Sequence, residues 1–246
     1  MCIRHRYAPA SATTPASAGS TRCAVTSLTS SAPSSSARAA TAAFEVSIEP
    51  VLEALSGEPV SIDTSKAAVA ARALELGAEL VNVGTALRGE PELAGVVADG
   101  GAYLCLMHML GTPRTMPDDP HYDDEAGEVA AFLEERLAFA VAAGIPEERI
   151  CLDPGFGFGK TVEHNVELLR RLGELAALGR PLLVGLSRKR SLGRLLGDPD
   201  ATVGTEAASV GAAVAALDRG ATIFRVHDVR AHIEALTVAA AVAGAG

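Results

Sequence analysis

The sequence is poor in several residue types, and each shortage excludes a class of protein. Its 246 residues include four cysteines, no tryptophan and only 4% aromatic residues. Four cysteines without a C-x-x-C pair are too few for a disulfide scaffold, and they indicate no zinc or redox centre. No run of about 18 uncharged apolar residues occurs, so we expect no membrane-spanning helix. We also expect no secretory signal, because the start lacks a short apolar segment.

Acidic residues are missing from the first 43 positions. Residues 1–43 hold four arginines among 12 alanines, nine serines and six threonines. Residues 44–246 hold 17 basic and 30 acidic residues, so the two parts differ in kind. The net charge of −9 argues against non-specific binding to nucleic acid or to an anionic membrane.

The low-complexity composition of residues 1–43 shows no helix or strand period. Such a segment buries too little apolar surface to offset the ordering of its backbone, which costs about 1–2 kcal/mol per residue. Three interpretations are open: a disordered tail, an organellar transit peptide rich in Arg and Ser, or an out-of-frame product of GC-rich DNA. The ratio of 18 arginines to 3 lysines in the whole chain is typical of GC-rich codons.

Residues 44–246 alternate short apolar runs with longer amphipathic ones. The apolar runs predict strands at 59–62, 79–82, 102–107, 149–152, 181–186 and 222–226. The amphipathic runs predict helices at 45–55, 66–76, 91–98, 125–143, 161–178, 203–219 and 229–243. Strict alternation of strand and helix is typical of right-handed βαβ units around a parallel sheet.

Six such units fit either an open, doubly wound sheet or most of an eight-stranded barrel. A polar residue stands at or just after the end of every predicted strand: Asp63, Asn82, His108, Asp153, Ser187 and His227. An open sheet gathers its ligands near one switch point, whereas a barrel builds its site around all the carboxyl ends. The pattern therefore favours an α/β fold of the (β/α)8 TIM-barrel class, with about six of the eight βα units recognisable.

Residues 152–160, Leu-Asp-Pro-Gly-Phe-Gly-Phe-Gly-Lys, carry the densest motif. The glycines free the backbone to turn or to approach a ligand closely, and the phenylalanines offer flat surfaces for a ring. Asp153 could accept two parallel N–H bonds from the amino-imine edge of a planar heterocycle. The alternative is a tight turn with both phenylalanines in the core. A nucleotide-binding P-loop is disfavoured, because the spacing from Gly155 to Gly159 is one residue too short.

Two further motifs combine cations with other polar groups. Residues 185–190 place Ser187 and three cations after a strand, which suits an anion or a ring carbonyl, or else forms a solvated basic turn. Arg225 and His227 alternate along a strand and face one side, which suits a diphosphate, or else Arg225 forms a surface pair with Asp228. His108 lacks a companion metal ligand, so we predict a hydrogen-bonded core or rim histidine.

Five segments, in their order along the chain, resemble those of bacterial dihydropteroate synthases, the pterin-binding enzymes of folate biosynthesis. The segments are SIDTSK, LMHMLGTPRTM, LDPGFGFGK, VGLSRKR and RVHDV. The resemblance covers residues 44–246 and implies a (β/α)8 barrel. It implies a transferase that condenses 6-hydroxymethyl-7,8-dihydropterin diphosphate with p-aminobenzoate, giving 7,8-dihydropteroate and diphosphate. It also implies a cytoplasmic location, a homodimer as one possible assembly, and no nucleic-acid or membrane partner.

The resemblance also implies a role for individual residues. The pterin-binding set comprises Asp63, Asn82, Met107, Asp153, Phe158, Gly185 and Lys189. Ser187 corresponds to a residue near the p-aminobenzoate carboxylate, and Arg225 and His227 correspond to the diphosphate anchors. Lys189, Arg225 and His227 are the implied catalytic residues. The family's reaction uses no protein nucleophile, so catalysis rests on orientation and electrostatics.

Two features depart from the family pattern. Asn82 is followed by Val83, where the family usually has aspartate. The first two strand-and-loop units, of the types NVTPDSFSDGG and GGESTRPG, have no counterpart, and residues 1–43 stand in their place. Mg²⁺ is implied by the resemblance, but its usual protein contact belongs to the first of these loops, so no metal ligand is assigned. A transit peptide would precede these units rather than replace them, so a disordered or out-of-frame segment is favoured for residues 1–43.

Two alternatives to an active synthase stay open. One is an inactive or binding-only relative, truncated or frame-shifted, because a barrel short of two strands exposes two unpaired edges. The other is a methyltetrahydrofolate-binding methyltransferase barrel. That family shares the pterin-binding carboxylates, but it would not be expected to need diphosphate anchors.

Overall fold

An eight-stranded sheet forms the centre of this computed structural model, which describes residues 2–4, 26–29, 48–112, 115–117 and 119–244. The strand order is β1-β8-β7-β6-β5-β4-β3-β2, and all neighbours from β3 to β8 pair in parallel. The strands are β1 (Cys2–Arg4), β2 (Thr26–Thr29), β3 (Val60–Asp63), β4 (Leu80–Val83), β5 (Tyr103–Met107), β6 (Ile150–Asp153), β7 (Leu182–Val184) and β8 (Ala221–Arg225). The six strands predicted from the sequence are all confirmed, with bounds that differ by at most two residues.

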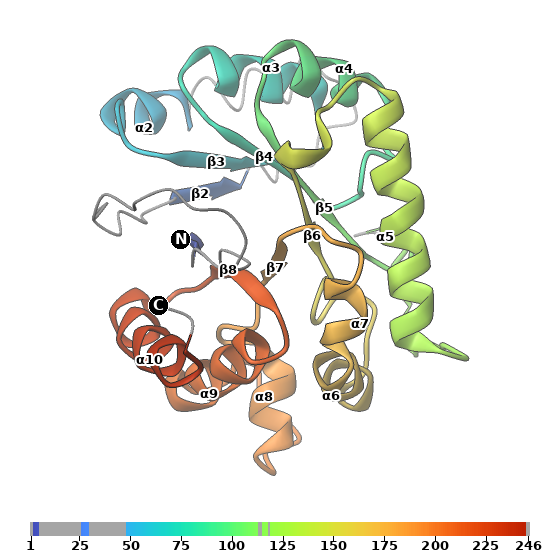
Figure 1. Cartoon of the computed structure of the whole chain (residues 1–246), viewed down its shortest axis with the longest axis vertical. Coiled ribbons are helices and arrows are strands. Elements are labelled where there is room, and N and C mark those ends of the chain that lie inside the picture. The colour runs from blue at the N-terminus through green and yellow to red at the C-terminus, as the bar shows by residue number, and fades with distance from the viewer. Residues whose placement is uncertain (1, 5–25, 30–47, 113–114, 118, 245–246) are drawn as a thin grey trace.

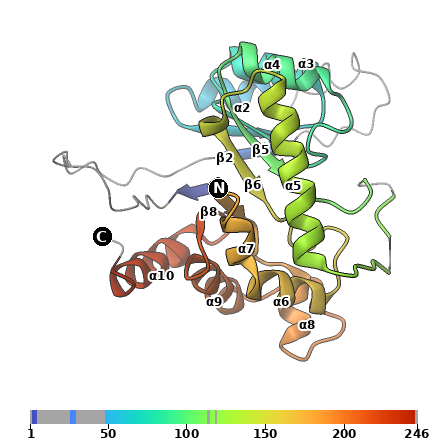
Figure 2. The ribbon, with the colours of Figure 1, turned by 45° about the vertical axis from the view of Figure 1, so that its right-hand side comes forward.

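Helices surround the outside of the curled sheet (Figure 1). They are α2 (Glu49–Ala54), α3 (Ala67–Glu75), α4 (Glu92–Asp99), α5 (Glu125–Ala142), the 3₁₀ helix η1 (Glu147–Arg149), α6 (Val162–Arg170), α7 (Leu172–Ala176), α8 (Arg190–Leu195), α9 (Glu206–Leu217) and α10 (Val229–Val242). Figure 2 shows α5, the longest of these, beside β5 and β6. None of the helices within the described ranges is both long and apolar enough to cross a membrane.

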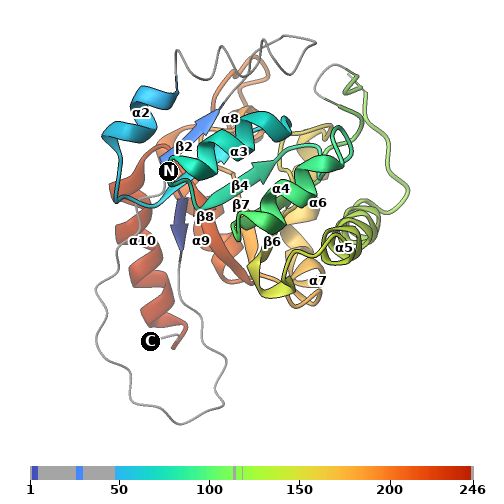
Figure 3. The same ribbon diagram turned by 90° about the horizontal axis from the view of Figure 1, so that it is seen from above.

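The arrangement confirms the predicted α/β class of a TIM barrel built from parallel βα units. Seen from above, α10 and α5 lie on opposite sides of the central strands (Figure 3). The parallel register brings the carboxyl ends of neighbouring strands to one edge, where Asp63 stands opposite Asn82, and Met107 opposite Asp153. In a barrel of this kind, that edge is where active sites are built.

Two short strands lie within residues 1–43, where the sequence predicted none. β2 pairs in parallel with β3, whereas β1 pairs antiparallel with β8. An antiparallel β1 differs from the parallel strand that a complete (β/α)8 barrel has at this edge. The rest of residues 1–43 lies outside the described residues, so a disordered or out-of-frame segment stays a prediction.

Apart from shifted helix ends and the unpredicted 3₁₀ helix η1, the helical pattern differs from prediction at two places. The expected helix 161–178 is divided into α6 and α7 at Arg171, whose backbone (φ −98°, ψ 15°) leaves the helical conformation. Gly173 follows two residues later, and glycine weakens a helix interior by about 1 kcal/mol. α8 was not predicted, because it packs through Ser191 and Gly193 while Leu195 is exposed, the reverse of an amphipathic pattern.

Apolar residues on both faces of the strands form the core. Leu104, Leu106 and Leu152 are fully buried in the large cluster that also includes apolar side chains of the helices. Cys105 and Cys151 stand opposite each other on β5 and β6, in a smaller buried cluster. Both cysteines are free and buried.

A reciprocal cap begins α6 at Thr161. The Thr161 hydroxyl accepts a hydrogen bond from the His164 backbone N–H at 3.2 Å, and His164 Nδ1 accepts one from the Thr161 N–H at 3.2 Å. Replacing Thr161 with alanine is expected to lower the free energy of unfolding by about 1 kcal/mol. Chemical denaturation measures the change. Thr237, exposed in the middle of α10, is the control, because alanine there should be neutral or slightly stabilising.

Candidate active site

Four strands bring their terminal polar side chains into one hydrogen-bonded chain. Asn82 at the end of β4 donates from Nδ2 to Asp63 Oδ2 of β3 at 3.0 Å. Arg225 at the end of β8 donates from Nη1 to Asn82 Oδ1 at 3.3 Å and from Nη2 to Asp153 Oδ2 of β6 at 2.7 Å. The structure therefore places four of the residues predicted to bind substrate side by side.

Asp153 is the most deeply buried member of this chain, with 1% of its surface exposed. Its second oxygen, Oδ1, accepts a hydrogen bond from the Gly155 N–H at 2.8 Å. Each carboxylate oxygen has two acceptor positions, so Asp153 retains capacity for a ligand's N–H groups while it pairs with Arg225. The geometry suits the recognition of an amino-imine edge.

The Asp63 carboxyl has a pKa above its ordinary value. Burial is the largest cause and disfavours the charged form, and the nearby Asp153 acts in the same direction. The Arg225 charge and the hydrogen bond from Asn82 oppose the rise. Asp63 therefore binds a proton more readily than an aspartate in water does.

Lys189 and Phe158 face each other at the mouth of the site. The Lys189 ammonium lies 4.2 Å from the centre of the Phe158 ring, which is cation–π distance. Burial lowers the pKa of Lys189 to about 8, while the Asp153 charge opposes the fall and Arg225 adds to it. Phe156, in contrast, is buried in the core, so only one phenylalanine of the motif faces the site.

Met107 and Gly185 form close walls around the same polar groups. Met107, at the end of β5, is buried and stands opposite Asp153 in the sheet register. A Cβ at Gly185 would lie 3.0 Å from Arg225 Nη2, so the absence of a side chain leaves room for the guanidinium. Both residues therefore shape the pocket rather than add charge to it.

Ser187 and His227 form a separate pair beside this cluster. The Ser187 hydroxyl accepts from the His227 backbone N–H at 3.1 Å and lies 3.0 Å from His227 Nδ1. Burial is the largest cause of a lowered His227 pKa, and the Arg188 charge adds to it. The exposed His227 ring is thus held beside Ser187 rather than beside Arg225.

The predicted alternative of a surface pair between Arg225 and Asp228 is wrong. Asp228 pairs with Arg188, whose Nε donates to Oδ2 at 3.0 Å, while Arg225 turns inward to Asp153. The cations of residues 185–190 consequently take different positions. Arg188 forms the surface pair, Lys189 enters the site, and Arg190 lines a neighbouring cavity.

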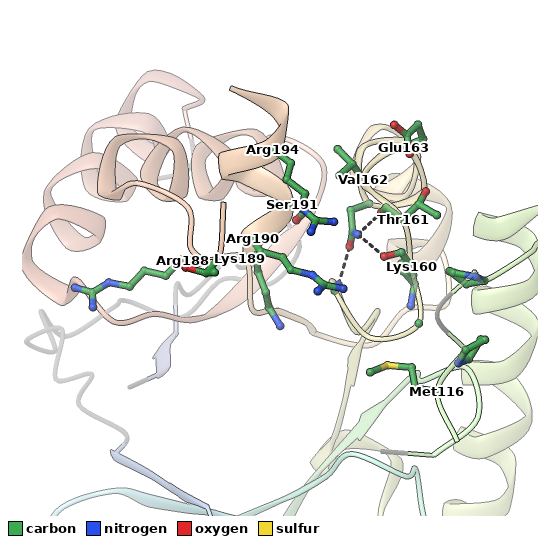
Figure 4. A pocket seen from close by; sticks show the side chains of 16 residues that line it. Met116, Lys160, Thr161, Val162, Glu163, Arg188, Lys189, Arg190, Ser191 and Arg194 are labelled. Atoms are coloured by element: carbon green, nitrogen blue, oxygen red, sulfur yellow. Dashed lines mark hydrogen bonds between the residues drawn. The ribbon is translucent and has the colours of Figure 1, made fainter. Parts of the chain in front are cut away.

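A cavity of about 520 Å³ adjoins the site between α6 and α8. Figure 4 shows Arg190, Ser191 and Arg194 of α8 facing Thr161 and Val162 at the start of α6. Lys189 and Gly157 also line this cavity, so it is continuous with the residues around Phe158. Its basic lining suits a ligand that carries a negative charge.

Val83 fills the position after Asn82 where the resemblance expects a carboxylate. Its side chain is fully buried in the main core cluster. A carboxylate at this position would need a partner for its charge among apolar neighbours. The departure from the family pattern is therefore compatible with the packing of β4.

Lys160 and His108 form a buried pair, of which the sequence predicted only the histidine. His108 is buried and hydrogen-bonded to Lys160, as expected for a core histidine, and burial lowers its pKa to about 2, with Lys160 adding to the fall. In the sequence, Lys160 stands out only as the last residue of the motif 152–160. The one signal for it was its rarity, since the chain has three lysines.

Glu125, the first residue of α5, is a second buried charge that the sequence did not reveal. It is 6% exposed, and neither carboxylate oxygen has a hydrogen-bond partner among the described residues. Burial raises its pKa to about 7; Lys160 opposes the rise and Glu167 reinforces it. Glu125 is therefore a group inside the protein that titrates near neutral pH.

Replacing Glu125 with glutamine is expected to flatten the pH dependence of stability. Because the folded pKa of about 7 exceeds the ordinary value of 4.5, stability present at low pH is lost as the pH rises through 7. Glutamine does not titrate, so the variant lacks this loss. Urea unfolding between pH 4.5 and 8 measures it, with Glu134→Gln on the exposed face of α5 as the control. Parallel slopes for the two variants would contradict the assignment.

The described residues do not offer a site of the kind that Mg²⁺ prefers. No group of three or more His, Cys, Asp or Glu side chains gathers anywhere in the described ranges. The two carboxylates of the site, Asp63 and Asp153, are held by Asn82 and Arg225, and the Arg225 guanidinium would repel a divalent cation placed between them.

Comparison with known proteins agrees with this geometry. The family model of pterin binding enzymes matches residues 27–227. The dihydropteroate synthase of Neisseria meningitidis serogroup C is 48% identical over 195 residues, covering 77% of this chain and 68% of the relative. The enzyme of Escherichia coli K12 is 42% identical, covering 80% of this chain and 72% of the relative.

Solved structures show the same relationship. Dihydropteroate synthase from Thermus thermophilus in complex with 4-aminobenzoate superposes with a TM-score of 0.73 at 49% identity, covering 78% of this chain and 75% of the other. The Xanthomonas albilineans enzyme in complex with 7,8-dihydropteroate gives 0.72 at 36% identity, covering 88% and 92%. This chain therefore belongs to the pterin-binding enzymes and, within them, to the dihydropteroate synthase family of transferases.

Proposed function

We propose that this protein condenses 6-hydroxymethyl-7,8-dihydropterin diphosphate with p-aminobenzoate to give 7,8-dihydropteroate and diphosphate. The observation that carries the proposal is the buried Asp153, aligned with Asn82 and Asp63 at the carboxyl edge of the sheet. This row presents the carboxylate and amide groups that an amino-imine ring edge requires. Related synthases have been solved with 4-aminobenzoate and with dihydropteroate bound.

In this assignment each polar group has one task. Asp153, Asn82 and Asp63 orient the pterin ring, with Met107, Phe158 and Gly185 as its walls. Lys189 lies against the Phe158 ring and within the electrostatic influence of Asp153, a position from which it would reach a ring carbonyl. Arg225 and His227 offset the negative charge of the departing diphosphate, and Ser187 stands next to His227 on the p-aminobenzoate side.

The bond changes need no nucleophile from the protein. The carbon–oxygen bond between the pterin methylene and diphosphate breaks, and the amine of p-aminobenzoate forms the new carbon–nitrogen bond and loses a proton. Positive charge develops on the methylene and negative charge on the diphosphate. The site acts by orienting both substrates and by placing cations near the leaving group.

Arg225 and His227 have different hydrogen-bond partners in the structure. Arg225 is bound to Asp153 and Asn82, and His227 is bound to Ser187. We propose that the diphosphate draws the two side chains together as the pterin occupies Asp153. Charge-assisted hydrogen bonds to the diphosphate oxygens would compensate the contacts that Arg225 gives up.

Diphosphate release by the purified chain tests the proposed function. Release should require both substrates, because the amine of p-aminobenzoate is the acceptor. A binding-only relative, the alternative that the sequence left open, would bind the pterin diphosphate without releasing diphosphate. The relatives at 42–48% identity do not favour that alternative, nor do they favour a methyltransferase barrel.

We also propose a homodimer formed through α9 and α10. Apolar side chains of these helices border a shallow groove, and Val238 and Val242 of α10 are exposed. Burying this surface against a second copy would remove it from water. Analytical ultracentrifugation should show a dimer that Val238→Lys dissociates. A location in the cytoplasm, the lack of a nucleic-acid partner and a requirement for Mg²⁺ stay predictions.

A further inference from the structure

The ammonium group of Lys160 is buried and saturated with hydrogen bonds. It is 7% exposed, and its Nζ lies 2.9 Å from His108 Nδ1, 3.1 Å from the Gly155 carbonyl oxygen and 3.3 Å from the Phe158 carbonyl oxygen. A lysine ammonium has three N–H donors and no acceptor, so the three contacts match its capacity. His108 Nδ1 must therefore accept, which places the imidazole proton on Nε2.

Each of these contacts reaches a part of the substrate site. Gly155 binds Asp153 Oδ1 through its N–H, and Phe158 lies against Lys189. The His108 backbone N–H bonds to the Asp153 carbonyl oxygen at 2.9 Å. Lys160 is not hydrogen-bonded to Asp63, Asn82 or Asp153. It binds the loop that follows Asp153, through the Gly155 and Phe158 carbonyl oxygens.

The loop held by Lys160 has little stiffness of its own. Gly155, Gly157 and Gly159 all have positive φ, and glycine gives up more conformational freedom than any other residue when it is ordered. Within the loop, a turn bond joins the Phe158 N–H to the Gly155 carbonyl oxygen at 3.1 Å. Asn165 Oδ1 accepts from the Gly157 N–H at 2.7 Å and the Tyr122 hydroxyl donates to the Gly159 carbonyl oxygen at 2.8 Å, so Lys160 shares the ordering of this loop and holds it on the Phe158 side.

Glu125 is a second buried ionisable group whose charge acts on Lys160. It lies at the start of α5, both its oxygens lack a hydrogen-bond partner among the described residues, and Lys160 and Glu125 influence each other electrostatically. Asp153 favours the ammonium as well, and Lys189 disfavours it. When Glu125 is ionised, its charge favours the ammonium form of Lys160.

The geometry points to Lys160 as a positioning residue of the synthase site, which holds Phe158 and His108 in place. This inference rests on the proposed function for its catalytic consequence. It assigns no contact between Lys160 and either substrate. Methionine at this position keeps much of the volume of the lysine chain but removes all three donors.

Lys160→Met is expected to raise the KM for the pterin diphosphate and lower kcat, with a fall in kcat/KM of about 10- to 100-fold, since small misplacements of a site have effects of this size. The KM for p-aminobenzoate should change less. A second readout is nuclear magnetic resonance of the ¹⁵N-labelled His108 ring. Its Nδ1 signal should shift in the variant, because the Lys160 donor is lost.

Glu125→Gln is the second variant, in case Lys160→Met does not fold. It leaves all Lys160 donors in place and should raise the pterin KM at least about threefold relative to Glu134→Gln on the same helix. A folded Lys160→Met with wild-type kinetics and an unshifted His108 signal would overturn the inference. Equal KM values for Glu125→Gln and Glu134→Gln would overturn the role of Glu125. A wild-type chain without turnover would instead refute the proposed function. In that case the His108 signal would still show whether Lys160 is hydrogen-bonded to the His108 imidazole ring.

Discussion

Asparagine in place of Asp153 is expected to reduce the affinity for the pterin diphosphate by at least about 100-fold. The substitution replaces one carboxylate oxygen with an N–H₂ group that faces the donors of the ring edge. Hydrogen bonds to a charged partner are worth about 1.5–3 kcal/mol each, so two weakened bonds account for this loss. Isothermal titration of the purified variant with the pterin diphosphate measures it.

Folding must be measured alongside affinity in this variant, because Asp153 is also the buried partner of Arg225. Removing one member of a buried ion pair costs about 3–5 kcal/mol. We therefore expect a lower melting temperature, with a circular dichroism spectrum still typical of an α/β protein in the cold. Glu234→Gln, which breaks the exposed pair with Arg230 on α10, is the control and should keep wild-type affinity. Unchanged pterin affinity in a folded Asp153→Asn protein would refute the pocket assignment.

Alanine in place of Gly155 is expected to have the largest effect on folding. Gly155 has φ +70°, and a Cβ built there would lie 1.8 Å from the His108 carbonyl oxygen. Backbone cannot yield as a flexible side chain can, so the two loops must separate or the chain must unfold. We expect a loss of at least about 4 kcal/mol in the free energy of unfolding, measured with urea.

Gly179→Ala isolates the steric part of that loss. Gly179 has nearly the same backbone angle, φ +73°, but a Cβ there would meet no atom within 4 Å. It should lose only the cost of a left-handed alanine, about 1–2 kcal/mol. Similar losses at Gly155 and Gly179 would show that the close approach of the two loops does not contribute to stability.

Much of the fold was predictable because its strands are short, apolar and buried on both faces. β3 to β8 each follow from such a run. α8 was missed because its buried residues are Ser191 and Gly193, which fit closely against neighbouring atoms without forming an apolar stripe. β1 and β2 were missed because strands of three and four residues are too short to show a period, and β2 lies among Ser- and Thr-rich residues. The pairing partners far along the chain, not local pattern, place these two strands.

The site was predictable where a polar residue directly ends a strand. Asp63, Asn82, Asp153 and Arg225 meet because parallel register aligns the ends of β3, β4, β6 and β8. Sequence could not indicate that Arg225 would turn to Asp153, since that choice depends on space left by Gly185.

Buried charges behind the site were harder to predict. The association of Lys160 with Glu125 joins residues 35 positions apart on different elements, so it has no local signature. Neither the β6–α6 loop sequence nor the start of α5 suggests by itself that its charge is buried. Only the fold, in which α5 packs beside β5 and α6, brings the two groups near enough to influence each other's pKa.

Mass spectrometry of the product made by the purified 246-residue chain tests the central claim most directly. With the pterin diphosphate and p-aminobenzoate both present, we predict 7,8-dihydropteroate and one diphosphate for each molecule formed. The Asp153→Asn protein should form neither under the same conditions. Diphosphate without dihydropteroate, or no product from a folded chain that binds both substrates, would contradict the claim that this chain is a working synthase.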